Sequence, residues 1–312
     1  MRALGVGGPS VDTVLTNPNT RPGLSLDGQV HVVGGDHEVE ISYVALSLVT
    51  RVEVESGGGE HDSLVEFHKV SVSGAFRLAP GARHSIPFSF PVPWETPVTD
   101  VYGHRLPGMT MGLRTELAVA KAVDKSDLDA VHVHPLPAQE RILDAFTRLG
   151  FRFVTADLER GHLRGVPQTL PFYQEIEFRP SGPYARGINE VEVTFVAGPT
   201  HLDVVLEFDK RGGWLSPGHD AYGHFRVAHV DADRTDWDAV VEGWVRQASE
   251  RYSALRTSHG HGYPYHQGHG HRGYGAGAVV AGAAAGVLGG MLLGEALEEM
   301  AEGFGDFGDV GE

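Results

Sequence analysis

The chain has 312 residues, no cysteine and a net charge of −16, with 41 acidic against 25 basic side chains. The absence of cysteine excludes disulfides, thiolate zinc sites and cysteine nucleophiles, and the length predicts about two domains. The acidic balance makes nucleic acid an improbable partner, because no cluster of Lys and Arg could offset the repulsion from phosphates. The N-terminal stretch has one Arg and no apolar core typical of a secretory signal, so we expect a cytoplasmic protein.

Residues 1–124 are expected to form a first β-sandwich lobe, since short segments of alternating apolar and polar residues are separated by glycine-rich turns. In residues 83–92 one face collects His84, Ile86, Phe88, Phe90 and Val92. Proline at alternate positions of this segment predicts a strand at the edge of a sheet, because proline cannot donate to a neighbouring strand. In residues 37–55 the alternation changes phase, which predicts a bulge or a strand that crosses between two sheets.

Residues 125–150 are expected to connect two lobes. Their first part is polar and bounded by proline, and a short helix is predicted over residues 138–149. Pro137 near the predicted start and Gly150 just past the predicted end suit the two ends of a helix. The helix has one apolar stripe, made of Ile142, Leu143, Phe146 and Leu149.

Residues 151–256 are expected to form a second β-sandwich lobe. Glutamates alternate with apolar residues around residues 174–178 and 190–195, and further alternating segments follow. The lobe is predicted to end in an amphipathic helix over about residues 236–255, with its apolar face in the core. That face holds Trp237, Val240, Val241, Trp244, Val245, Ala248, Tyr252 and Leu255.

Residues 257–274 form a His- and Gly-rich linker outside both lobes. Imidazoles at this density bind nickel, copper or zinc weakly in a flexible chain. A low-complexity linker with adventitious metal affinity and a selected metal-binding or pH-sensing role both stay open. The candidate weak metal ligands are His259, His261, His266, His269 and His271.

Residues 275–312 combine an apolar segment with an acidic end. Residues 276–294 carry no charge, and glycine recurs at every fourth position: Gly282, Gly286, Gly290 and Gly294. On a helix these glycines share one face, which allows close approach of a second helix. Membrane association, self-association into a homo-oligomer and disorder are all open for this segment. The acidic end is expected to be solvated, with Phe304 and Phe307 as a candidate docking peptide.

The sequence contains no nucleophile-elbow, P-loop or HExxH motif. The glycines of residues 5–9 are interpreted as a turn, and His132 with His134 as linker residues, since no third metal ligand is identifiable. Acidic residues near the last predicted helix are interpreted as helix caps and first-turn charges rather than calcium ligands. They are Asp231, Asp233, Asp236 and Asp238. We therefore expect no cofactor and no enzymatic activity.

Segments from both predicted lobes resemble the sporulation-control proteins of spore-forming bacteria. In the first lobe they are GGPSVDTVL, PGLSLDGQVHVVGG and IPFSFPVPWETPVT, and at the joint LRTELAVAKAVDKSDLDAVHVHPLPAQERILDAFTRLGFRF. In the second lobe they are PFYQEIEFRP, INEVEVTFVA and HLDVVLEFDKRGGW. The resemblance covers about residues 1–230 and implies an all-β fold of two tandem arrestin-like β-sandwich lobes. It also implies a regulatory role in sporulation or development and supplies no catalytic residues.

The leading interpretation is a cytoplasmic, non-enzymatic adaptor-like regulator that binds proteins at sandwich edges and in the groove between the lobes. Binding would proceed by strand addition to an exposed edge, and residues 276–294 would supply any membrane association. The alternative is a carbohydrate- or small-ligand-binding β-sandwich module. It needs an exposed aromatic platform or a polar pocket, for which Trp94, Tyr102 and Trp214 are the candidates.

Overall fold

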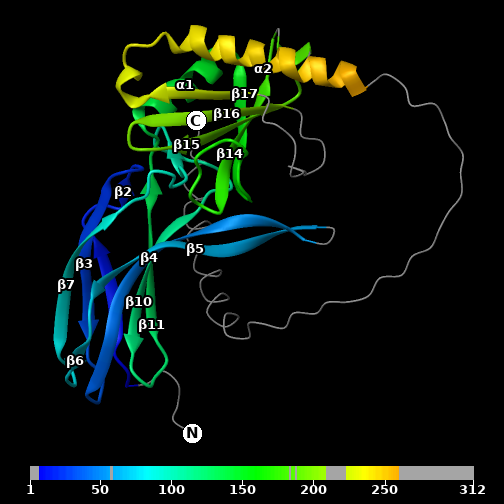
Figure 1. Cartoon of the computed structure of the whole chain (residues 1–312). Coiled ribbons are helices and arrows are strands. Elements are labelled where there is room, and N and C mark those ends of the chain that lie inside the picture. The colour runs from blue at the N-terminus through cyan, green and yellow to red at the C-terminus, as the bar shows by residue number, and fades with distance from the viewer. Residues whose placement is uncertain (1–6, 57–58, 183, 187, 209–222, 260–312) are drawn as a thin grey trace, which may run out of the picture.

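The computed structural model describes residues 7–56, 59–182, 184–186, 188–208 and 223–259. Figure 1 shows two β-rich lobes arranged end to end, with both α-helices on the second lobe. The predicted all-β fold class is confirmed, including the short helix between the lobes and the helix after the last strand. The finer description of the lobes as arrestin-like stays a prediction.

The first lobe contains two sheets that enclose a core. A three-stranded antiparallel sheet is made, in spatial order, of β1 (Ser10–Leu15), β3 (Ser25–Val33) and β7 (Arg83–Pro91). The second sheet contains β4 (Val39–Ser56), β5 (Gly59–Ser73), β6 (Phe76–Leu78), β10 (Met111–Val119) and β11 (Lys125–Ala130). Two short pairs complete the lobe: β2 (Asn19–Thr20) with β12 (His132–Val133), and β8 (Asp100–Val101) with β9 (His104–Arg105).

Strand β7 lies at the edge of its sheet, as its prolines predict. Ile86, Phe88 and Phe90 point into the core, although His84, which shares their alternation, is exposed. Just after β7, the N–H of Val92 donates to the carbonyl of Leu24, and the carbonyl of Val92 accepts the N–H of Gly23, next to the start of β3. By alternation, the prolines of β7 therefore turn toward the free edge, where their missing N–H costs no ladder bond.

Strand β4 accounts for the change of phase seen in residues 37–55. Its pairing with β5 shifts register between Val44 and Ala45 and again between Ser47 and Leu48. The strand is 18 residues long and also pairs with β10 in the first lobe. Near its end, Glu53 pairs with Glu159 of β13 in the second lobe. The predicted bulge is thus confirmed, and the same strand passes from one lobe into the other.

The second lobe is a meander of antiparallel strands. In chain order and in space they are β13 (Phe151–Arg160), β14 (Phe172–Pro180), β15 (Val191–Ala197), β16 (His201–Phe208) and β17 (Gly223–Ala228). Short 3-10 helices lie at Tyr184–Arg186 and His229–Asp231. Because β13 joins β4, these strands and the larger sheet of the first lobe form one ten-stranded sheet.

Both predicted helices are present. Helix α1 (Pro137–Arg148) ends before Gly150, whose φ of 89° suits glycine at a helix end. Helix α2 (Trp237–His259) begins where the Asp236 carboxylate accepts the N–H of Ala239 at 3.3 Å. The first part of the predicted apolar face of α2 is confirmed as core by four buried side chains: Trp237, Val241, Val245 and Ala248. The side chains of Tyr252 and Leu255 lie outside the described residues.

The segment expected to begin the connector is a strand instead. Residues 125–130 form β11, which pairs with β10 along its whole length. The polar sequence of β11 is typical of a loop, but in the structure Asp127 accepts a hydrogen bond from the backbone of Thr13 at the edge of the sheet. The connection to α1 is therefore confined to about residues 131–136, while the lobe boundaries 1–124 and 151–256 stay predictions.

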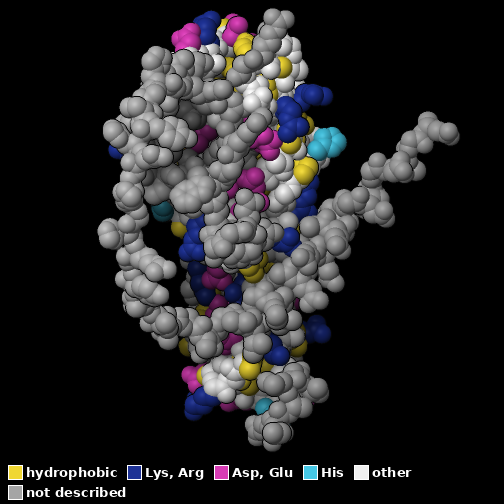
Figure 2. All heavy atoms as spheres, turned by 90° about the vertical axis from the view of Figure 1, so that its right-hand side faces the viewer, with side chains coloured by type: hydrophobic (Ala, Val, Ile, Leu, Met, Phe, Trp, Pro, Cys, Tyr) yellow, Lys and Arg dark blue, Asp and Glu magenta, His cyan; other side chains and the backbone are white. Residues whose placement is uncertain are grey.

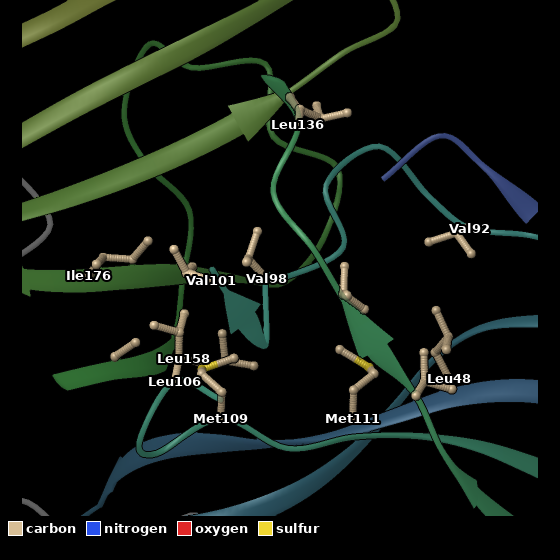
Figure 3. Close-up of a cluster of buried hydrophobic side chains, with 14 of the residues drawn as sticks. Leu48, Val92, Val98, Val101, Leu106, Met109, Met111, Leu136, Leu158 and Ile176 are labelled. Atoms are coloured by element: carbon tan, nitrogen blue, oxygen red, sulfur yellow. The ribbon is translucent and has the colours of Figure 1, made fainter. Parts of the chain in front are cut away.

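One apolar core continues through both lobes. Figure 3 shows Leu48 and Met111 of the first lobe in the same cluster of buried side chains as Leu158 and Ile176 of the second. The segment between β7 and β10 fills the space between them with Val98, Val101, Leu106 and Met109. The two lobes are consequently joined by packed side chains as well as by chain connections.

Candidate functional site

The predicted sites of the tail lie outside the described residues. This applies to the apolar segment with Gly282, Gly286, Gly290 and Gly294, and to His261, His266, His269 and His271. His259 is the last residue of α2, and its side chain is also outside the description. In the part of the chain that the structure describes, neither helix is long and apolar enough to cross a bilayer.

The joint between the lobes is fixed by side chains that bond to backbone. Gln174 of β14 accepts the N–H of Val98 at 2.9 Å and donates to the carbonyl of Val98 at 2.7 Å. Glu95 accepts the backbone N–H groups of Thr169 and Leu170. These bonds tie the segment after β7 to the second lobe across a part-buried interface.

In the described part of the chain, one small cavity lies between the lobes. A cavity of about 20 Å³ lies there, lined by Trp94, Gln139, Gln174 and neighbouring residues. That volume suits one water molecule, whereas small-molecule sites measure several hundred cubic ångströms. This cavity is therefore too small for an ordinary small-molecule ligand.

The aromatic residues proposed for carbohydrate binding do not form a common platform in the described residues. Trp94 is half-buried and stacks on His229 with ring centroids 5.7 Å apart. Tyr102 is 52 % exposed, and its hydroxyl bonds to Asp144, while burial and that carboxylate raise the pKa of the phenol. Trp214 lies outside the described residues.

The histidines and acids near the linker and the last helix have structural partners. His132 lies 3.2 Å from the Asp100 carboxylate and His134 lies 2.9 Å from Asn19. Asp233 pairs with Arg141, and Asp238 pairs with Arg148. With Asp236 capping α2, these contacts agree with the structural interpretation of both groups.

A charged cluster on β16 and β17 was not anticipated from the sequence. Asp203 is 1 % exposed and accepts hydrogen bonds from Arg226 at 2.9 and 3.2 Å. His224 lies 2.6 Å from the same carboxylate and His201 3.6 Å. Burial acts to raise the pKa of Asp203, but the bonds from Arg226 and His224 prevail and hold that pKa below its usual value. The cluster fixes polar side chains along the last strand of the sheet.

Acidic side chains also gather on the second lobe. Figure 2 shows Asp and Glu interleaved with Lys and Arg over one side of the described residues. Oxygens of Asp157, Glu159 and Glu175 lie within 4.8 Å of one another. Carboxylates of this kind can hold a hard divalent cation. Each of the three already interacts with other groups of the protein, so their grouping does not by itself identify a metal site.

The acidic group could be read only in part from the sequence. The alternation of glutamates along residues 174–178 and 190–195 places them on one face of each strand. Their convergence depends on register: Asp157 opposes Glu175, and Glu192 opposes Glu207. Burial and the charge of Glu175 raise the pKa of the neighbouring Tyr173. Such register between distant strands leaves no local signal in the sequence.

A second acidic group lies in the first lobe, at a contact that we call the β1–β11 seam. It consists of Thr13 of β1, Thr115 of β10, and Asp127 and Asp129 of β11. The hydroxyls of Thr13 and Thr115 are 2.6 Å apart and buried, and the N–H of Thr13 donates to Asp127 at 2.7 Å. No strand ladder joins β1 to β11, so polar side chains hold these two edges together.

Comparison with known proteins gives concordant matches. The profile of the family described as SpoOM protein matches residues 1–212. The chain is 35% identical over 244 residues to the sporulation-control protein spo0M of Bacillus subtilis (strain 168), across 76% of this chain and 92% of that protein. It is also similar to the crystal structure of Spo0M, sporulation control protein, from Bacillus subtilis, with a TM-score of 0.70 and 32% identity. That match covers 78% of this chain and 100% of the other.

Proposed function

Since this chain belongs to the SpoOM protein family, we propose that it is a non-enzymatic regulator that acts in sporulation or development by binding other proteins. The membership confirms the resemblance recognised in the sequence. The relationship to a sporulation-control protein supports a regulatory role in sporulation. Binding of partner proteins is the finer part of the proposal and draws on the strand edges.

Unpaired strand edges support protein binding. Within the described residues, β1, β5, β7, β11 and β17 each pair with a strand on one side only. An extended segment of a partner can add to such an edge through backbone hydrogen bonds, while side-chain contacts give specificity. Natural proteins protect edges that must not pair, for example with proline.

Strand β17 is a better acceptor of an added strand than β7. The prolines at 87 and 91 remove two outward donors from β7. On β17 the N–H of the next residue, His229, donates to Thr200 on the β16 side at 3.1 Å. By alternation, the backbone groups of His224, Arg226 and Ala228 face away from β16. The strand contains no proline, so these outward groups keep their donors.

Two genetic changes test this proposal in the cells that carry the protein: deletion of the gene and the substitution Ala228→Pro, each followed by counting spores over time. Removing the gene is expected to change the number or timing of spores. Ala228→Pro removes one outward donor at a residue whose φ of −84° lies near the proline range, and it should reproduce much of that defect. Ala228→Ser is the matched control and should behave as wild type. Normal sporulation without the gene contradicts the role, and normal sporulation with Ala228→Pro contradicts the β17 edge.

Association through the tail is a further part of the proposal. Residues 276–294 lie outside the described residues, and the sequence pattern supports either insertion in a membrane or packing against a second copy. Gly286→Leu combined with Gly290→Leu should abolish crosslinked oligomers and keep recovery in the membrane fraction, because leucine favours lipid and blocks close helix approach. Unchanged oligomer size contradicts self-association, and absence of wild type from the membrane fraction contradicts membrane association.

A further inference from the structure

The β1–β11 seam closes one side of the first sandwich without backbone pairing. The N–H of Thr16 donates to the backbone carbonyl of Asp27 in β3 at 2.9 Å, so alternation along β1 turns the N–H of Thr13 away from β3. That N–H donates to the carboxylate of Asp127. A side-chain carboxylate thus occupies the place that the carbonyl of a neighbouring strand would otherwise take.

Asp129 lies on the same face of β11 as Asp127. Their cross-strand neighbours on β10, Leu113 and Thr115, are fully buried, so both carboxyl groups turn toward the interior. Oδ2 of Asp129 is buried and has no hydrogen-bond partner. A carboxylate with a buried oxygen that lacks a partner is costly when charged and far less so when it carries a proton.

The charged groups around Asp129 do not compensate it. Burial is the main cause that raises the pKa of Asp129 to about 7, and among the described residues the charges of Asp127 and Asp12 add to this rise.

The basic side chains nearby have other neighbours. Arg114 of β10 pairs with Glu66 at 2.8 Å, and it opposes Leu128 on the other face of β11. His31 of β3, opposite Asp12, bonds to Ser85. The side chain of Lys125 lies beside Gly8.

We propose that the β1–β11 seam is a pH-sensitive latch that is held closed by a proton on Asp129 and loosens when this proton is lost. An acid with a raised pKa in the closed state favours closure fully below its ordinary pKa near 4. This contribution is lost as the pH rises from there to about 7, and it levels off above that value.

Opening the latch would free the outward edge of β1 and the adjacent edge of β11. Both edges would then offer unpaired backbone groups to an incoming strand. This last step rests on the proposed function and would place strand addition under the control of pH. The latch itself depends only on the geometry of the seam.

Hydrogen exchange of the full chain tests the latch directly. Exchange rates for segments covering β1 and β11 are corrected for the intrinsic effect of pH and compared at pH 5 and pH 8. In the wild type, protection of β1 should fall by about tenfold or more, as expected when one proton controls the opening. Asp129→Asn should keep the protection of pH 5 at both pH values, because the amide cannot ionise.

Two further variants keep the result interpretable. Asp27→Asn changes the same charge at an exposed position of β3 and should retain the wild-type response. Asp12→Asn removes one neighbouring charge and should raise protection at pH 8, which provides a test if Asp129→Asn does not fold. An unchanged pH response in Asp129→Asn, or no response in the wild type, overturns the latch. If the purified protein shows the expected latch but cells without the gene sporulate normally, only the proposed function is contradicted.

Discussion

The joint between the lobes and the β1–β11 seam both bring distant parts of the chain together, but they do so by different chemistry. At the joint, buried apolar side chains such as Met111 and Leu158 are backed by Gln174, which satisfies both backbone groups of Val98. At the seam, Asp127 takes one backbone N–H, and the buried Oδ2 of Asp129 has no hydrogen-bond partner. The difference indicates a fixed connection between the lobes and a weaker contact within the first lobe.

The largest effect is expected at the joint. Met111 is 1 % exposed, and Met111→Ala should lower the free energy of unfolding by about 2–5 kcal/mol, since it leaves a cavity in the shared core. Urea unfolding followed by tryptophan fluorescence and by circular dichroism should give one coincident transition for both lobes. Val123→Ala, at an exposed position, should change stability by less than about 0.5 kcal/mol. Separate transitions would show that the lobes unfold independently.

The polar part of the joint should come next. Gln174→Leu preserves much of the volume but leaves the N–H and the carbonyl of Val98 without partners. We expect a loss of about 2–3 kcal/mol, because each buried unsatisfied group costs about 1–3 kcal/mol. Urea unfolding measures this loss, and Gln29→Leu on the exposed face of β3 is the control. A loss no larger than that of the control would mean that water replaces the glutamine.

A carboxylate that has its partners should respond to pH in the opposite direction from the latch. Because the folded-state pKa of Asp203 is lowered, its contribution is present above the unfolded value near 4 and is lost as the pH falls through the folded value. Asp203→Asn should therefore cost about 1–2 kcal/mol at pH 7 and less at pH 3. Thermal unfolding of both proteins at the two pH values checks this. A cost that does not depend on pH would contradict the assigned ion pair.

The smallest effect is expected from Asp129, and its sign is the informative part. Asp129→Asn should raise the global stability by about 1 kcal/mol at pH 8, a value discounted because the side chain is partly exposed. The gain should largely vanish at pH 3, about one unit below the ordinary pKa of Asp, where the wild-type carboxyl group is mostly protonated in both states. Thermal unfolding at these two pH values is sufficient. A loss of stability at pH 8 would indicate that the carboxylate has a favourable partner.

Local patterns in the sequence were sufficient for elements whose environment is uniform along their length. Alternating prolines identified β7 as an edge, and proline with glycine marked the two ends of α1. The same approach missed β11, because Asp127 and Asp129 read as loop residues until the contact with Thr13 is known. Asp203 and the group around Glu175 were missed for a related reason: strand register brings their neighbours from positions far along the chain, and no local pattern records it.

The long strand β4 has a consequence for how the chain emerges from the ribosome. Its partner β5 follows immediately, so one side of β4 can be covered as soon as the hairpin forms. The end of the other side waits for β13, whose contact at Glu159 is synthesised roughly a hundred residues after Glu53. At about 5–20 residues per second this leaves an open edge on the nascent chain for roughly 5–20 seconds. Arg51 and Glu53 place charges on that waiting segment, and charges of this kind discourage pairing with other unfinished chains.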